Sequence, residues 1–341
     1  MPARAIPSLL VLLAMTAQPL AVAPASAQEA SPQPSPLDVV GESPFGPDDE
    51  IGMLNRMTDA SRLDIVSRIA SGKVYDLSVE YFVGMPSYDF NGQPRYQILN
   101  VHTPKGTIVD DTTGQGDAVN EHLTYSGSMF SMYAHTGTHV DALAHFGLGG
   151  TIWNGFTADE HLGDRGWRRA GVENYPPIIA RGVLIDVAAY KGVDMLPESY
   201  GITVADIDGT LEAQGSEVRE GDVVMVRTGR MALFEEDRDA YMANTPGLTR
   251  ESANHLADLG AILVGADNIS TDVGPSEEDF NYLPVHSSML TGRGVPIMQN
   301  VDLQELAADD VHEFAWFGAP LKLRGSDGGP MRPFAMPLRS E

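Results

Sequence analysis

Apolar positions along the chain follow two spacings that predict different elements. Recurrence at every third or fourth residue, as at Leu63, Val66 and Ile69, is typical of a helix with one buried face. This spacing predicts helices over 59–70, 203–214 and 249–259, with Gly72 as a stop for the first and Thr203 as an N-cap for the second. Short apolar runs between polar segments predict strands over 74–79, 182–187, 222–227, 261–265 and 296–299.

The order of these elements favours a mixed α/β fold. Strands outnumber helices, and the helices are not regularly interposed between strands as they would be in a doubly wound parallel sheet. No G-x-G-x-x-G segment follows a predicted strand, so the main signal of a dinucleotide-binding fold is missing. We therefore expect one mixed α/β domain over residues 44–341.

The first 27 residues have the pattern of an export signal. Arg4 supplies a positive start, an apolar run covers 9–15, and Ala-Ser-Ala at 25–27 fits a small-residue cleavage site. The run is short for a membrane anchor, so we expect cleavage and a mature protein that is periplasmic or secreted and not held in a membrane. Residues 28–43, rich in Pro and Ser, are predicted to be a linker.

Charge and cysteine content exclude several classes of function. The chain has 22 Lys+Arg against 47 Asp+Glu, a formal charge of −25. A surface with this charge repels phosphate backbones, which argues against nucleic-acid binding. There is no cysteine, which excludes thiolate nucleophiles, Cys-ligated zinc and iron–sulfur clusters. Any metal must therefore be held by His, Asp, Glu, Gln or water.

Four polar donors lie within eleven residues of the sequence: His135, His139, Asp141 and His145. The spacing from His135 to His139 suits one face of a helix, whereas the spacing from His139 to Asp141 suits one face of a strand. The two spacings together, around Gly137, predict a strand or turn that runs into a short helix. Gly137 permits a close backbone approach or an unusual φ.

This cluster points to a catalytic metal site. Imidazole nitrogens and a carboxylate are good donors for zinc or manganese. Two His and one Asp leave open positions for water and substrate, which marks a catalytic site more than a structural one. His145 lies just beyond these ligands, and its ordinary pKa near neutrality suits general acid/base chemistry. The alternative is that these are ordinary surface or core histidines, although four clustered donors favour the metal.

The run 135–145 resembles the H-x-G-T-H-x-D-x-P-x-H signature of the cyclase-like metal-dependent hydrolases, a family of the kynurenine formamidase and isatin hydrolase type. Leu143 stands where the family usually has proline. Because leucine can adopt the φ of proline, the backbone of this segment need not change. The resemblance covers roughly residues 45 to 337. Further similar blocks lie at 46–52, 54–55, 75–78, 84–86, 153–155, 221–222, 227–229 and 284–286.

The resemblance implies a role for each matching residue. It implies that His135, His139 and Asp141 ligate the metal, and that His145 carries protons. His286 matches a further ligand of the two-metal members. Gln299 stands where those members have a glutamate that bridges two metals. A neutral amide bridges poorly, so we expect a single divalent metal, Mn²⁺ or Zn²⁺, with Gln299 as an oxygen ligand and His286 nearby.

The resemblance also sets expectations for fold, substrate and assembly. It implies a swivelling β/β/α-type single domain with a mixed, barrel-like sheet, and a homo-oligomer. It places an aromatic residue at the position of Tyr88, which is expected to contact a small-molecule substrate.

We expect a hydrolase that cleaves the carbon–nitrogen bond of a cyclic amide or formamide. A bound metal would activate water and polarise the carbonyl, with His145 as the general acid/base. Hydrolysis of a lactone, or a lyase or dehydrating cyclase reaction at the same site, is the first alternative. A periplasmic metal- or ligand-binding protein without catalysis is the second.

Overall fold

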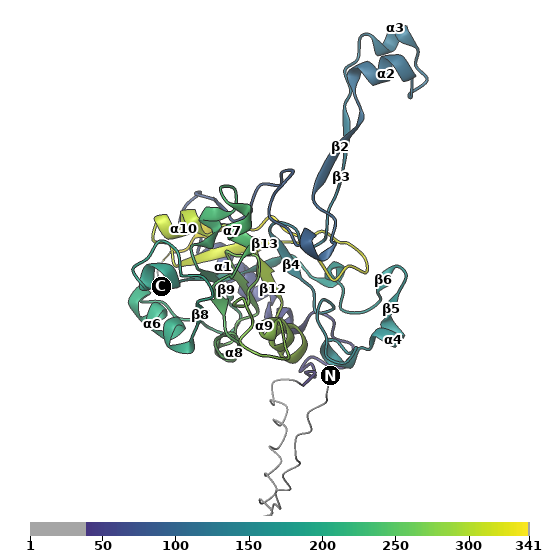
Figure 1. Ribbon diagram of the computed structural model, residues 1–341. Helices are drawn as coiled ribbons and strands as arrows, with labels where there is room; N and C mark the ends of the chain where they lie inside the picture. The colour runs from purple at the N-terminus through teal and green to yellow at the C-terminus, as the bar shows by residue number, and fades with distance from the viewer. Residues whose placement is uncertain (1–38, 340–341) are drawn as a thin grey trace, which may run out of the picture. The chain divides into compact units, whose positions relative to one another are not determined.

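A nine-stranded mixed sheet organises the computed structural model, which describes residues 39–339 (Figure 1). The strand order is β1-β15-β13-β7-β9-β11-β12-β4-β14. The strands span β1 Tyr75–Asp76, β4 His139–Asp141, β7 Ile178–Asp186, β9 Val223–Arg227, β11 Leu263–Ala266, β12 Ile297–Gln299, β13 Glu313–Gly318, β14 Gly328–Pro330 and β15 Phe334–Pro337. The predicted export signal and the predicted linker as far as residue 38 lie outside the described residues, and the domain boundaries remain predictions.

The centre of the sheet is parallel and is built from strand–helix–strand units. β7, β9, β11 and β12 pair in parallel, with α6 (Val204–Gln214) between β7 and β9 and α8 (Arg250–Leu259) between β9 and β11. The helices are thus interposed regularly in this part, which the sequence pattern did not indicate. Both helices begin at a threonine N-cap whose side chain accepts a hydrogen bond from the third residue beyond it, as the Thr203 prediction required.

The flanks of the sheet are antiparallel. β13 pairs antiparallel with β7 and β15 on one side, and β4 pairs antiparallel with β12 and β14 on the other. The result is a mixed α/β fold with a curled, half-barrel sheet, which confirms the predicted fold class. The three-residue strand β4 carries His139 and Asp141 and lies between two neighbours, so the candidate metal residues are held inside the sheet.

Alternate residues of the central strands pack into two apolar layers. In β9, Val224 and Val226 face one buried cluster, whereas Val223 and Met225 face the other. Because both faces are covered, the strand reads in the sequence as an unbroken apolar run. This explains why the predictions over 182–187, 222–227 and 261–265 located β7, β9 and β11.

The helices are short. They span α1 Asp59–Ser67, α2 Pro104–Asp110, α3 Asp117–Asn120, α4 Ala158–His161, α5 Val187–Tyr190, α7 Arg238–Met242, α9 Pro284–His286 and α10 Gln304–Ala308, besides α6 and α8. A π-helix, Ser287–Arg293, continues directly from α9. Within residues 39–339, no helix has both the length and the apolar character that a membrane crossing requires.

Three small sheets complete the fold. The pairs are β2 (Gln97–His102) with β3 (Gly127–Ser131), β5 (Leu162–Gly163) with β6 (Gly166–Trp167), and β8 (Gly201–Ile202) with β10 (Gly247–Leu248). β2 and β3 form a long hairpin that carries α2 and α3 at its end and extends away from the main sheet (Figure 1).

Candidate metal centre

The segment that contains the motif approaches the sheet as a turn and enters it as β4. Gly137 has a φ of +65°, and a Cβ there would lie 2.6 Å from Cζ of Tyr81, so both reasons for a glycine at this position are confirmed. After Asp141 the chain turns and no helix forms, so the predicted short helix is wrong. In a strand, residues two apart point to the same face, so β4 places His139 and Asp141 on one side without a helix.

The Asp141 carboxylate is the point on which the other polar groups converge. Its Oδ1 lies 2.6 Å from Nδ1 of His135 and 3.4 Å from Nε2 of His139. Its Oδ2 lies 3.5 Å from Nε2 of His286 and accepts a hydrogen bond of 3.1 Å from Nε2 of Gln299. All five side chains are buried. The fold thus brings together every residue that the sequence proposed as a metal ligand.

His145 also lies in this cluster. The ligand atoms of His135, Asp141 and His145 fall within 4.8 Å of one another, which is a spacing that can hold a metal ion. The rings of His145 and His135 stack with their centroids 3.9 Å apart. Of these three residues, His145 has the most exposed side chain, at 18%, so it lies at the open side of the site. The geometry therefore allows His145 to act as a ligand as well as in the proton-carrying role that the sequence predicted.

Two of the histidines are oriented by hydrogen bonds at their far nitrogen. Nδ1 of His139 donates to the carbonyl oxygen of Gly137 at 2.7 Å, and Nδ1 of His286 lies 2.5 Å from Oδ2 of Asp272. Each bond places a proton on Nδ1, on the side away from Asp141, while Nε2 of each ring faces the Asp141 carboxylate. Nε2 of His139 is buried and has no hydrogen-bond partner among the described residues. An unpartnered buried nitrogen directed at a carboxylate fits a metal ligand.

Burial and opposite charges shift the titration of the cluster. Burial alone would lower the pKa of His135, but the carboxylates of Asp141 and Asp327 outweigh it and raise that pKa to about 9. Burial would raise the pKa of Asp141, yet His145 and His135 hold it well below its usual range. Burial, together with the charges on His135 and His286, lowers the pKa of His145. The site therefore combines an ionised carboxylate with a neutral imidazole at its open side.

Two carboxylates of the site were not found in the sequence. Asp327, in the turn before β14, lies 3.2 Å from Nε2 of His135 and 3.5 Å from Nδ1 of His145. Asp272 orients His286. The only sequence signal was the block Pro284–His286, which drew attention to His286 but not to its partner.

Gln299 lies beside Asp141, and Tyr88 lies near enough to Asp141 and Asp272 for their charges to affect its titration. Gln299 directs its amide nitrogen at Asp141 and at Nε2 of His286, 3.2 Å away, so an oxygen-ligand role requires a rotated amide. The hydroxyl of Tyr88 donates to the carbonyl oxygen of Ile269 at 2.8 Å. Burial raises the pKa of Tyr88, and the negative charges of Asp141 and Asp272 add to the effect. Both roles stay predictions.

A curled mixed sheet that concentrates three histidines on one buried carboxylate defines a candidate metal-dependent enzyme. Residues 75–273 match the Cyclase family, described as "Putative cyclase". The match covers more than half of the chain, which therefore belongs to this family.

Curated relatives and solved structures agree with this membership. Kynurenine formamidase of Paracidovorax citrulli is 28% identical over 211 residues, which cover 60% of this chain and 77% of the relative. Isatin hydrolase of Roseibium aggregatum is 26% identical over 208 residues, which cover 59% and 71%. The crystal structure of a novel cyclase superposes with a TM-score of 0.78 at 25% identity, over 89% of this chain and 99% of that one.

The named relatives are hydrolases acting on carbon–nitrogen bonds, and the His/Asp cluster fits a metal site. Together they support a metal-dependent hydrolase.

Proposed function

We propose that this chain hydrolyses the carbon–nitrogen bond of a small cyclic amide or formamide, with one divalent metal, Mn²⁺ or Zn²⁺, at Asp141. The observation that carries the proposal is the buried, unpartnered Nε2 of His139, which faces Asp141 together with His135 and His286. The relatives named for formamide and isatin chemistry supply the choice of bond.

His135, His139 and Asp141 would hold the metal, with His286 and Gln299 within reach of the same carboxylate. When bound, such a cation lowers the pKa of a water molecule and polarises a substrate carbonyl. Burial of the cluster strengthens the electrostatic interactions within it, because little water is present to screen them.

His145 is the residue that we propose moves the proton. Its lowered pKa leaves the imidazole neutral near pH 7, so it can accept a proton. Nδ1 faces Asp327 at 3.5 Å, and Nε2 faces the Asp141 side of the site, 4.0 Å from Oδ2. Nε2 would take the proton from the attacking water as the new carbon–oxygen bond forms. It would return the proton to the leaving nitrogen as the carbon–nitrogen bond breaks.

Tyr88 is proposed to line the substrate side of this centre. Its hydroxyl is already committed to Ile269, so we expect the ring face, and not the hydroxyl, to contact substrate. The ring lies 5.8 Å from that of Phe90, whose side chain is 69% exposed. A planar substrate would find an apolar surface there.

The test is turnover of a defined panel by metal-loaded protein in water enriched in ¹⁸O. The panel holds N-formylkynurenine, isatin, other cyclic amides and one lactone. Hydrolysis predicts one ¹⁸O atom in the acid product, whereas elimination predicts none. A metal-loaded protein that turns over no member of the panel would favour a binding protein and contradict the proposal.

A further inference from the structure

The carboxylate of Asp327 faces the rings of two histidines of the candidate metal centre. Oδ1 lies 3.2 Å from Nε2 of His135, and Oδ2 lies 3.5 Å from Nδ1 of His145. The two rings are stacked, with their centroids 3.9 Å apart and an angle of 29° between their planes. One carboxylate therefore faces both stacked rings, with a separate oxygen for each ring.

The other nitrogen of each ring faces Asp141. Nδ1 of His135 lies 2.6 Å from Oδ1 of Asp141, and Nε2 of His145 lies 4.0 Å from Oδ2 of the same residue. Nδ1 of His145 is buried and makes no hydrogen bond of good geometry among the described residues, and Asp327 is the carboxylate that it faces. Catalytic hydrogen bonds are often long in the absence of substrate and shorten when the complex forms.

The backbone of β14 holds Asp327 in this position. β14 pairs with β4 so that Gly328 lies opposite Asp141, and the backbone N–H of Ala142 donates a hydrogen bond of 2.8 Å to the carbonyl oxygen of Asp327. A Cβ at Gly328 would lie 2.5 Å from Cε1 of His135, so a glycine is needed for this close approach. The position of the carboxylate is therefore set by the sheet.

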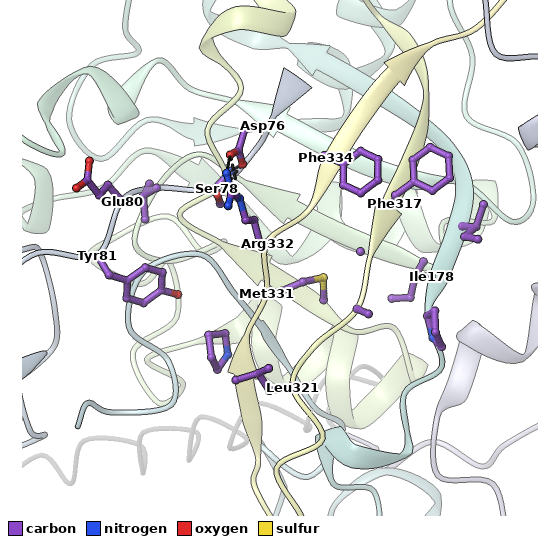
Figure 2. A pocket seen from close by; sticks show the side chains of 16 residues that line it. Asp76, Ser78, Glu80, Tyr81, Ile178, Phe317, Leu321, Met331, Arg332 and Phe334 are labelled. Atoms are coloured by element: carbon purple, nitrogen blue, oxygen red, sulfur yellow. Dashed lines mark hydrogen bonds and ion pairs between the residues drawn. The ribbon is translucent and has the colours of Figure 1, made fainter. Parts of the chain in front are cut away.

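The far end of the same segment is anchored as well. The backbone N–H of Met331 donates to the carbonyl oxygen of Thr138 at 3.0 Å. Pro330 and Met331 line a groove of about 950 Å³ (Figure 2). Of the described residues that line this groove, none belongs to the candidate metal centre. The segment thus presents Asp327 to the metal centre at one end and borders a separate groove at the other.

A carboxylate suits the position of Asp327 because both of its oxygens accept hydrogen bonds. Nε2–H of His135 and Nδ1–H of His145 can therefore both donate to it. An amide of the same shape has one oxygen and one NH2 group, so one of the two rings would face a donor. The hydrogen bond made by one ring nitrogen decides which nitrogen of a neutral histidine carries the proton.

We propose that Asp327 is a positioning residue that fixes the tautomers of His135 and His145 together. With Nε2–H of His135 donating to Oδ1, Nδ1 of that ring is left free on the side of Asp141. With Nδ1–H of His145 donating to Oδ2, Nε2 of that ring is left free to take the proton from water. Because it uses His145 as the proton carrier, this role rests on the proposed function, but its effect on the rings can be measured without turnover.

The tautomer of His145 in the native, zinc-loaded protein is the first test, and it needs neither substrate nor an Asp327 variant. Long-range ¹H–¹⁵N correlation spectra of protein labelled with ¹⁵N-histidine distinguish the two neutral forms of each ring. The signal that is missing in His145→Ala belongs to His145. The proposal predicts the Nδ1–H form, and the Nε2–H form in the native protein would overturn it.

Asp327→Asn makes the two rings unequal. Because His135 directs Nδ1 at the metal, its proton stays on Nε2 and the amide oxygen faces His135. The NH2 group then faces Nδ1 of His145 and shifts the proton of that ring to Nε2. We expect the Nε2–H signal for His145 in this variant. At saturating zinc, kcat should fall about 10- to 100-fold, with KM changed less than about threefold.

Asp310→Asn is the matched control, because Asp310 faces Nε2 of His312 at 3.3 Å in a pair at the surface. This variant should keep the native kcat and the native signal of His145. An Asp327→Asn variant that also keeps both would overturn the proposal.

A double-mutant cycle distinguishes positioning through His145 from a general disturbance of the fold. In a His145→Ala background, Asp327→Asn should lower kcat by less than about threefold, because the ring on which it acts is absent. The same large loss in both backgrounds would overturn the proposal.

Failure of the positioning role and failure of the proposed reaction give different results. If the native protein turns over no member of the panel, the reaction fails, and the His145 signal in native protein and in Asp327→Asn still decides the role of Asp327. If the native protein is active and Asp327→Asn keeps its kcat and its Nδ1–H signal, the reaction stands and the positioning role is overturned.

Discussion

Oδ2 of Asp272 lies 2.5 Å from Nδ1 of His286, and this contact directs the opposite nitrogen of the imidazole at Asp141. A carboxylate behind a metal-binding histidine fixes the tautomer and the ring orientation, and increases the basicity of the ligand. We therefore expect Asp272, which lies outside the motif at 135–145, to affect the metal affinity of the site through His286.

Asp272→Asn is expected to weaken metal binding by about 10- to 100-fold while the protein remains folded. The measurement is a metal titration by competition with a chelator. Asp208→Asn is the matched control, because Asp208 lies 2.7 Å from Nε2 of His255 in an exposed pair. If both variants bind metal as the native protein does, the negative charge of Asp272 does not contribute to metal affinity, which contradicts this prediction.

The roles of His139 and His145 separate in the same assay. His139→Ala is expected to lose metal, because its Nε2 has no other partner. His145→Ala is expected to keep most of its metal and to lose about 10²- to 10⁴-fold in kcat, the usual effect of removing a general acid/base. The measurements are elemental analysis and turnover of the best substrate. Equal metal loss in the two variants would show that His145 is a ligand, as its distance from His135 and Asp141 allows.

Metal binding is expected to release protons near neutral pH. The raised pKa of His135, about 9, keeps its ring protonated in the metal-free protein at pH 7.5, and coordination requires one ring nitrogen to be free. About one proton or more should leave per metal at pH 7.5, and the number should fall as the pH rises through 9. The affinity should therefore increase with pH up to about 9.

Isothermal titration in two buffers of different ionisation enthalpy measures this release. Asp141 contributes none, because its pKa is held well below the usual range and it is already ionised. The same heat in both buffers at pH 7.5 would contradict the raised pKa of His135.

Gly137 is expected to be intolerant of a side chain. Gly137→Ala places a side chain on a residue with a φ of +65°, and its Cβ would lie 2.6 Å from Cζ of Tyr81. The Tyr81 ring is held in place because its hydroxyl donates a hydrogen bond to the carbonyl oxygen of Thr138. The strained φ costs about 1–2 kcal/mol, and the clash a further ~1–3 kcal/mol. Gly149→Ala is the control, with a φ of +56° and nothing within 4 Å of its Cβ. Urea unfolding should show a smaller loss of unfolding free energy for Gly149→Ala. Equal losses would mean that the Tyr81 ring moves freely.

The parts of the fold that the sequence predicted are those whose signal is local. Thr203 caps α6 as expected, and the apolar run of β9 lies within one residue of its predicted start. Of the strand predicted over 74–79, only Tyr75–Asp76 forms a strand, β1. Its length is set by the two residues that pair with β15, and local propensity does not reveal this pairing. The regular β7–α6–β9–α8–β11 order was missed because intervening short elements obscure it in the sequence.

The same distinction applies to the candidate site. His135, His139, Asp141 and His145 are close in sequence, so their spacing alone drew attention to them. Asp327 is 192 residues from His135, and nothing marks it among the 47 acidic residues of the chain. The fold brings it to the site by pairing β14 with β4.

Metal content tests the central claim most directly. Elemental analysis of the purified protein after loading with Mn²⁺ or Zn²⁺ and gel filtration should give about one metal per chain. Asp141→Ala, which removes the carboxylate shared by all the proposed ligands, should give almost none. Two metals per chain would show that Gln299 does not prevent a second metal from binding. A native protein that retains no metal under either loading condition would contradict the account.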